Sequence, residues 1–191
     1  MQPVLFIDHG SPMNAIEVNS YTKTLNLLGE KLAKPSSVLI ISAHWLTRGI
    51  YVTYTNGLLE TIHDFGGFPS ELFNKQYPAK GSKKLAEDIS KLISPIELNY
   101  DTKHGLDHGA WYVLTHLFPE ANIPIVGLSI DATQPPQYHF DLGQKLSKLS
   151  EQNVLIIASG NIIHSFEHLD PNQNAKPRDW ALEFQADFLK S

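Results

Sequence analysis

The chain has 191 residues, of which 42% are hydrophobic and 18% charged, and this composition is typical of a globular protein with one sizeable core. The formal net charge of -5 disfavours nucleic acid and anionic membranes as partners, because phosphate binding needs clustered lysine and arginine side chains. Cysteine is absent, which excludes disulfides, thiolate zinc sites and iron–sulfur clusters, so any metal ion must be held by histidine or carboxylate side chains.

The N-terminal segment has no charged leader, and a candidate site residue already stands at position 9. No apolar run reaches the length that a membrane-spanning helix needs. We therefore expect a cytoplasmic protein.

Short apolar runs alternate with amphipathic segments along the chain. The expected strands cover 4–7, 38–43, 51–55, 96–100, 124–130 and 154–158. Expected helices begin at Ser20, capped by that residue, at Ser82, at Asp107 and at Pro135, and a last one covers 180–188. This alternation predicts one α/β domain over residues 1–191, with a central, largely parallel sheet and helices on both faces.

The segment 61–72 is expected to be a loop because it contains Gly66-Gly67 and Phe68-Pro69. It also carries His63, Asp64 and Phe65, which is an unusual load of titratable and aromatic side chains. Loops of this kind often bind ligands, although the phenylalanines alone would also explain a loop packed onto the core.

Three of the apolar strands run into a histidine. His9 follows the first strand, His44 follows the second, and His164 follows the strand 154–158. Ligands of open α/β sheets bind beyond the carboxyl ends of the strands, so these three imidazoles are candidates for one metal or catalytic cluster. A carboxylate such as Asp8 is a candidate to complete or orient the set, and His104, His116 and His139 are interpreted as structural or solvated.

Five motifs together resemble the class III extradiol ring-cleaving dioxygenases, and the nearest branch is that of the 4,5-DOPA dioxygenase extradiol proteins. The motifs are DHGSPMN at 8–14, SAHW at 42–45, IHDFGGFP at 62–69, DHGAW at 107–111 and SGNIIHSF at 159–166. They occur in the order of the family, and the resemblance runs over nearly the whole chain. The resemblance implies an α/β fold with a mononuclear nonhaem metal ion, Zn(II) as isolated or Fe(II) for oxygen chemistry.

The resemblance also assigns roles to individual residues. His9 and His44 match the metal ligands, and His164 matches a histidine that is a ligand in some members and the active-site base in others. His108 resembles a residue that contacts substrate or bound oxygen, and His63 lies in a loop near the substrate pocket. The implied reaction inserts O2 into a DOPA-like catechol and yields a muconic semialdehyde.

Family members continue past the length of this chain, into a segment that supplies a further histidine ligand. We therefore expect either a chain shortened at its C-terminus or a site completed by His164, His63 or another chain. Two other functions stay open from the residues alone. One is zinc-dependent hydrolase or lyase chemistry on the same histidines, and the other is a binding protein without catalysis.

Overall fold

The computed structural model describes residues 1–165, 167–168, 170, 172 and 175–190. The chain forms two compact units, Met1–Gly160 and Asn161–Ser191. Among the described residues no helix is long and apolar enough to span a membrane.

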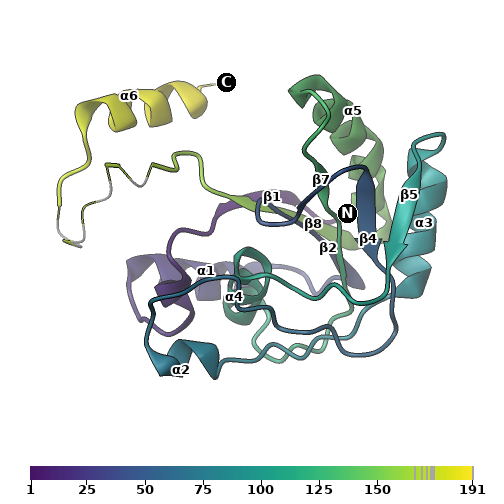
Figure 1. Cartoon of the computed structure of the whole chain (residues 1–191), viewed down its shortest axis with the longest axis horizontal. Helices are drawn as coiled ribbons and strands as arrows, with labels where there is room; N and C mark the ends of the chain where they lie inside the picture. The colour runs from purple at the N-terminus through teal and green to yellow at the C-terminus, as the bar shows by residue number, and fades with distance from the viewer. Residues whose placement is uncertain (166, 169, 171, 173–174, 191) are drawn as a thin grey trace. The chain divides into compact units, whose positions relative to one another are not determined.

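The first unit is built on a four-stranded sheet with the order β1-β8-β2-β6 (Figure 1). The strands are β1 (Val4–Asp8), β2 (Ser37–Ser42), β6 (Ile125–Gly127) and β8 (Val154–Gly160). All neighbouring pairs are parallel, and Ser159 of β8 is level with both Ile7 of β1 and Ser42 of β2. The carboxyl ends of β1, β8 and β2 therefore lie side by side at one edge of the sheet.

Helices cover both faces of this sheet (Figure 1). On one face α1 (Ser20–Lys31) and α4 (His108–Leu117) pack against the sheet, and on the other α3 (Lys83–Ile93) and α5 (Pro136–Leu146) do so. Side chains of a strand point alternately to the two faces, so Val38 and Ile40 join the first core cluster and Leu39 joins the second. Burial on both sides explains the unbroken apolar runs, and the predicted α/β fold is confirmed.

The helix starts follow from side-chain caps. Asp107 accepts a hydrogen bond from the backbone N–H of Ala110 and caps α4, as the sequence predicts. The prediction of Ser20 as the cap of α1 is wrong by one residue. Asn19 is the cap, because its side chain accepts from the Thr22 N–H while the Thr22 hydroxyl accepts from the Asn19 N–H.

The remaining strands form two small parallel pairs. β4 (Ile50–Thr53) pairs with β5 (Leu98–Asp101), and β3 (Leu46–Thr47) pairs with β7 (Ile130–Asp131). The predicted single strand over 124–130 is therefore divided between β6 and β7. The N–H of Leu128 still donates to the Ile40 carbonyl of β2, but Leu128 also bridges to Val52 of β4, and the chain then continues into β7.

Three short helices complete the first unit, namely η1 (Pro12–Ala15), α2 (Ser70–Phe73) and η2 (Ser147–Gln152). The loop predicted over 61–72 therefore ends at Pro69, directly before α2 begins. The second unit contains α6 (Asp179–Phe188), which has no buried residue. The last helix predicted from the sequence is thus present. Phe166 of the last motif lies outside the described residues, and so does part of the polar stretch before α6.

Candidate metal centre

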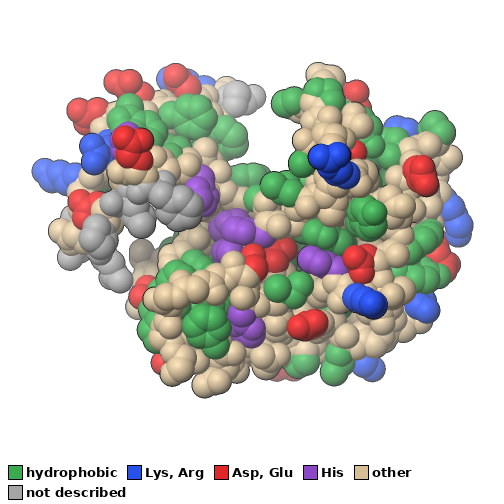
Figure 2. Space-filling view, in the orientation of Figure 1, with side chains coloured by type: hydrophobic (Ala, Val, Ile, Leu, Met, Phe, Trp, Pro, Cys, Tyr) green, Lys and Arg blue, Asp and Glu red, His purple; other side chains and the backbone are tan. Residues whose placement is uncertain are grey.

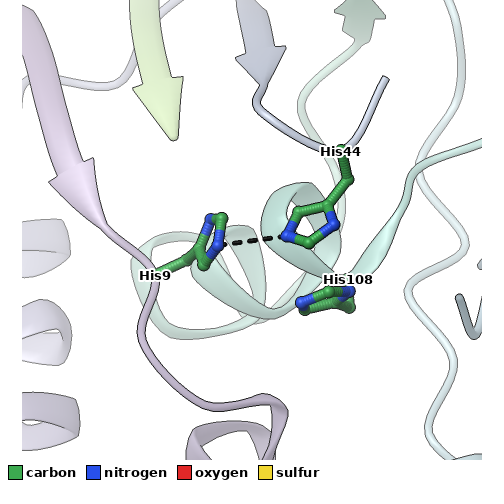
Figure 3. A group of neighbouring side chains, drawn as sticks. All are labelled: His9, His44 and His108. Atoms are coloured by element: carbon green, nitrogen blue, oxygen red, sulfur yellow. Dashed lines mark hydrogen bonds between the residues drawn. The ribbon is translucent and has the colours of Figure 1, made fainter. Parts of the chain in front are cut away.

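Three imidazoles meet at the carboxyl edge of the sheet (Figure 3). His9 directly follows β1, His44 lies two residues after β2, and His108 is the first residue of α4. The Nε2 atoms of His9 and His44 are 3.1 Å apart, and one ring nitrogen from each of the three residues lies within 4.8 Å of the others. His9 and His108 are buried, whereas His44 is exposed, so the group is accessible from solvent on the side of His44.

A buried hydrogen bond positions the start of α4 beside the end of β2. The hydroxyl of Ser42, the last residue of β2, donates to Oδ1 of Asp107 at 2.5 Å. Burial raises the pKa of the Asp107 carboxyl group, and the hydrogen bond from Ser42 offsets part of that increase. Because Asp107 also caps α4, the same carboxyl group fixes the first turn of the helix, and with it His108, near His44.

Asp64 is hydrogen-bonded to His108 and lies close to His44. Its Oδ1 accepts hydrogen bonds from both the backbone N–H and the ring Nδ1 of His108, each at 2.9 Å, and its Oδ2 lies 3.4 Å from Nδ1 of His44. Burial raises the pKa of the Asp64 carboxyl group, but the hydrogen bonds from His108 outweigh this effect and hold the pKa at about 2. An ionised carboxylate accepts only, so Nδ1 of His108 carries the proton, and in the neutral His108 ring Nε2 carries the lone pair.

The spacing of His9 and His44 fits a metal ion. Their Nε2 atoms form a hydrogen bond of 3.1 Å, so in the absence of a metal ion one of these two atoms carries a proton, and a bound cation would take the place of that proton. Imidazole nitrogens bind zinc at about 2.0–2.1 Å, so two of them on one ion are at most about 4.2 Å apart. The His9–His44 pair satisfies this limit, and a carboxylate behind a ligating imidazole is the usual partner of such rings.

The structure places the other candidate residues as follows. His63 is half-buried in the loop 61–72, where its Nε2 donates to the Lys75 carbonyl at 3.1 Å and its ring packs beside Trp111. Asp8 is exposed, and its Oδ1 accepts from the Gly10 N–H. His164 is an exposed residue of the second unit.

The histidines interpreted as structural have contacts within the fold. His104 stacks on Trp45, with ring centroids 3.9 Å apart, and burial lowers its pKa. His116 contacts the Asn14 carbonyl at 2.8 Å, and His139 contacts the Asp131 carbonyl at 3.0 Å.

Sequence reasoning missed the role of Asp64. The sequence shows Asp64 only as one of several titratable side chains in the segment 61–72, and it offers Asp8 as the candidate for the orienting carboxylate. The available signal was its position directly after His63 in a loop that is rich in glycine.

On the face of the molecule shown in Figure 2, histidine side chains reach the surface next to acidic side chains.

Comparison with known proteins gives a consistent set of relatives. The family model described as the catalytic LigB subunit of aromatic ring-opening dioxygenase matches residues 3–191. The chain is similar to the 4,5-DOPA dioxygenase extradiol of Escherichia coli (strain K12), with 43% identity over 183 residues that cover 95% of this chain and 67% of the relative. A protein of the same name from Mirabilis jalapa is 38% identical over 96% of this chain and 70% of its own length.

Among solved structures, the chain is similar to the crystal structure of an uncharacterized protein from Escherichia coli K12. The TM-score is 0.84 at 37% sequence identity, and the match covers 100% of this chain and 72% of that one. The fold is therefore shared over the whole chain.

Proposed function

The chain belongs to the family of the catalytic LigB subunit of aromatic ring-opening dioxygenases, and on that basis we propose that it inserts O2 into a DOPA-like catechol to give a muconic semialdehyde. It is a class III extradiol dioxygenase. We propose a DOPA-like substrate because relatives of the chain are named 4,5-DOPA dioxygenase extradiol.

The observation that carries the proposal is the pair of Nε2 atoms of His9 and His44, 3.1 Å apart. We propose these two residues as metal ligands. A bound divalent ion supplies a coordination site for catechol and O2 and, as Fe(II) rather than Zn(II), the electron transfer to oxygen that no side chain provides.

His108 is proposed to contact the substrate or oxygen rather than to bind the metal. The Nε2 atoms of His9 and His44 are close enough to be two ligands of one ion, whereas the ring nitrogens of all three residues are placed only within 4.8 Å of one another. The Nδ1 of His108 is held by Asp64, so its Nε2 is directed to the same space and can accept a proton from a catechol hydroxyl.

The loop that precedes α2 supplies an apolar wall beside this imidazole. The Phe65 ring meets the His108 ring edge-on, with centroids 5.6 Å apart, and it also packs against Phe68 at 5.5 Å. Both phenylalanines pack on the core as well, so the loop is anchored as the simpler interpretation predicted. We propose that the aromatic ring of the catechol packs against Phe65, which would exclude water from the reacting diol.

His164 and His63 keep the roles that the family resemblance gives them. We propose His164 as a further metal ligand or the active-site base, and the metal content of His164→Ala distinguishes the two because only loss of a ligand lowers it. We propose His63 as a residue of the substrate pocket, whose replacement by alanine raises KM without lowering metal content.

The test is anaerobic reconstitution with Fe(II), followed by oxygen-electrode and absorbance measurements with DOPA and with unsubstituted catechol. We expect O2 uptake matched by a yellow semialdehyde product, and a higher kcat/KM for DOPA. His9→Ala and His44→Ala should lose the iron with little change in thermal stability, while the control His139→Ala should keep it, because that ring is hydrogen-bonded to the Asp131 carbonyl. Iron retained in both ligand variants would refute the proposed site.

A further inference from the structure

Ser159 lies between the His9 ring and the backbone of α4. It is the sixth residue of β8, is 3% exposed, and is level with Ile7 and Ser42 in the parallel sheet. Its Oγ is 2.6 Å from the Gly109 carbonyl oxygen and 3.1 Å from Nδ1 of His9.

These two contacts determine which atom carries each proton. A carbonyl oxygen only accepts, so the Ser159 hydroxyl must donate to Gly109. A hydroxyl has one proton, so towards His9 the same oxygen can only accept, and Nδ1 of His9 must be protonated. In the neutral ring the lone pair then lies on Nε2, the atom that faces His44.

The backbone of α4 can take part only because residue 109 is glycine. A Cβ at this position would lie 2.8 Å from Nδ1 of His9 and 2.8 Å from Oγ of Ser42. The glycine therefore lets the helix approach the imidazole closely enough for its carbonyl group to hold the Ser159 hydroxyl.

We propose that Ser159 is a positioning residue that fixes the tautomer of His9, so that Nε2 is presented to the metal ion. Nδ1 of His44 lies 3.4 Å from a carboxylate, whereas the partner of His9 is a neutral hydroxyl whose proton is directed to the Gly109 carbonyl group. The consequence for metal binding rests on the proposed function, since it takes His9 as a ligand, whereas the tautomer itself does not depend on it.

The tautomer is measured in metal-free protein at a pH where His9 is neutral, by long-range proton–nitrogen NMR of 15N-labelled histidine, with His9→Ala to assign the resonances. The unmodified chain should show His9 protonated at Nδ1 alone. In Ser159→Ala this preference should be lost and a mixture of both tautomers should appear. Ser159→Cys keeps a side chain of similar size but a weaker hydrogen bond, and it should give an intermediate population.

Metal affinity gives a second measurement. Competition with a chelator should show Zn(II) and Fe(II) bound about 10- to 100-fold more weakly in Ser159→Ala, the range typical of groups that orient a ligand. The matched control is Ser129→Ala, which removes an equally buried hydroxyl that bonds to Tyr51 and Thr47 instead, and its affinity should equal that of the unmodified chain.

An unchanged His9 tautomer in both Ser159 variants would overturn the inference, whatever the metal does. Failure of the proposed function would show differently. His9→Ala would then bind metal as tightly as the unmodified chain, while the tautomer change in Ser159→Ala would still be observed.

Discussion

Replacing Asp64 tests whether one carboxylate organises the metal centre. Asp64→Ala removes two hydrogen bonds to His108 at 2.9 Å and a longer contact to His44 at 3.4 Å. The contact to His44 adds little because it is long and both side chains are more than a quarter exposed, at 29% and 27%. A hydrogen bond to a charged group contributes about 1.5–3 kcal/mol, so losing the ring contact to His108 corresponds to about 10- to 150-fold in an equilibrium constant.

A graded pair of variants separates charge from shape. Asp64→Asn keeps an acceptor oxygen but loses the charge, and since a neutral hydrogen bond contributes about 0.5–1.5 kcal/mol, we expect only about a tenfold loss of metal affinity or of kcat/KM. Asp64→Ala should cost more than Asp64→Asn in both quantities. A loss mainly in metal affinity would mean that His108 acts on the metal ion, and a loss mainly in kcat/KM would mean that it acts on the substrate.

The assay is chelator competition for Zn(II) and Fe(II), together with steady-state oxygen uptake and a thermal melt. Asp131→Asn is the matched control, because this carboxylate is buried and hydrogen-bonded to Thr133 rather than to an imidazole. If Asp64→Ala matched the unmodified chain in metal affinity and in kcat/KM, Asp64 would not orient the site.

Three further substitutions separate the site from the scaffold. Gly109→Ala should weaken metal binding by at least about tenfold, measured by metal analysis, because its Cβ would lie 2.8 Å from Nδ1 of His9 and from Oγ of Ser42; normal metal content would show that the helix can retreat. Leu114→Ala should lower the free energy of unfolding by about 2–5 kcal/mol in a denaturant titration, since this side chain is fully buried, and a loss under about 1 kcal/mol would contradict that packing. Asn19→Ala should cost about 1 kcal/mol through the lost cap of α1 without changing turnover; a change in KM would show that η1 and α1 shape the pocket.

The layered fold was predictable from the sequence because burial on both faces leaves a direct trace in it. Val38 to Ile41 contribute alternately to the two core clusters, and such a run can be apolar throughout only between two helical layers. The division of 124–130 into β6 and β7 was not predictable in the same way. Leu128 is as apolar as its neighbours, and its bridge to Val52 depends on where β4 lies, which no local pattern records.

The site was predictable in part for the same reason. His9 and His44 follow adjacent ends of parallel strands, so their proximity comes from the sheet itself. The position of His108 depends instead on Asp107, which joins α4 to Ser42, and on Asp64, which comes from a loop more than forty residues earlier in the chain. Contacts of that kind depend on tertiary structure, and the sequence shows only the residue types that can form them.

The register of β8 shows which of its residues lies beside His9. That residue is Ser159, and not His164, the histidine that follows the strand in the sequence. The strand-end rule says that residues at the carboxyl ends of neighbouring parallel strands lie at the same level, and the residue of β8 level with Ile7 and Ser42 is Ser159. A search for metal-binding side chains passes over this serine and stops at His164, five positions further along the chain. Yet Ser159 is the residue that contacts Nδ1 of His9, at 3.1 Å. The strand-end rule concerns positions in the sheet, whatever residue type occupies them. It therefore points to the Ser159 hydroxyl, which contacts the imidazole from behind and would not itself bind the metal ion.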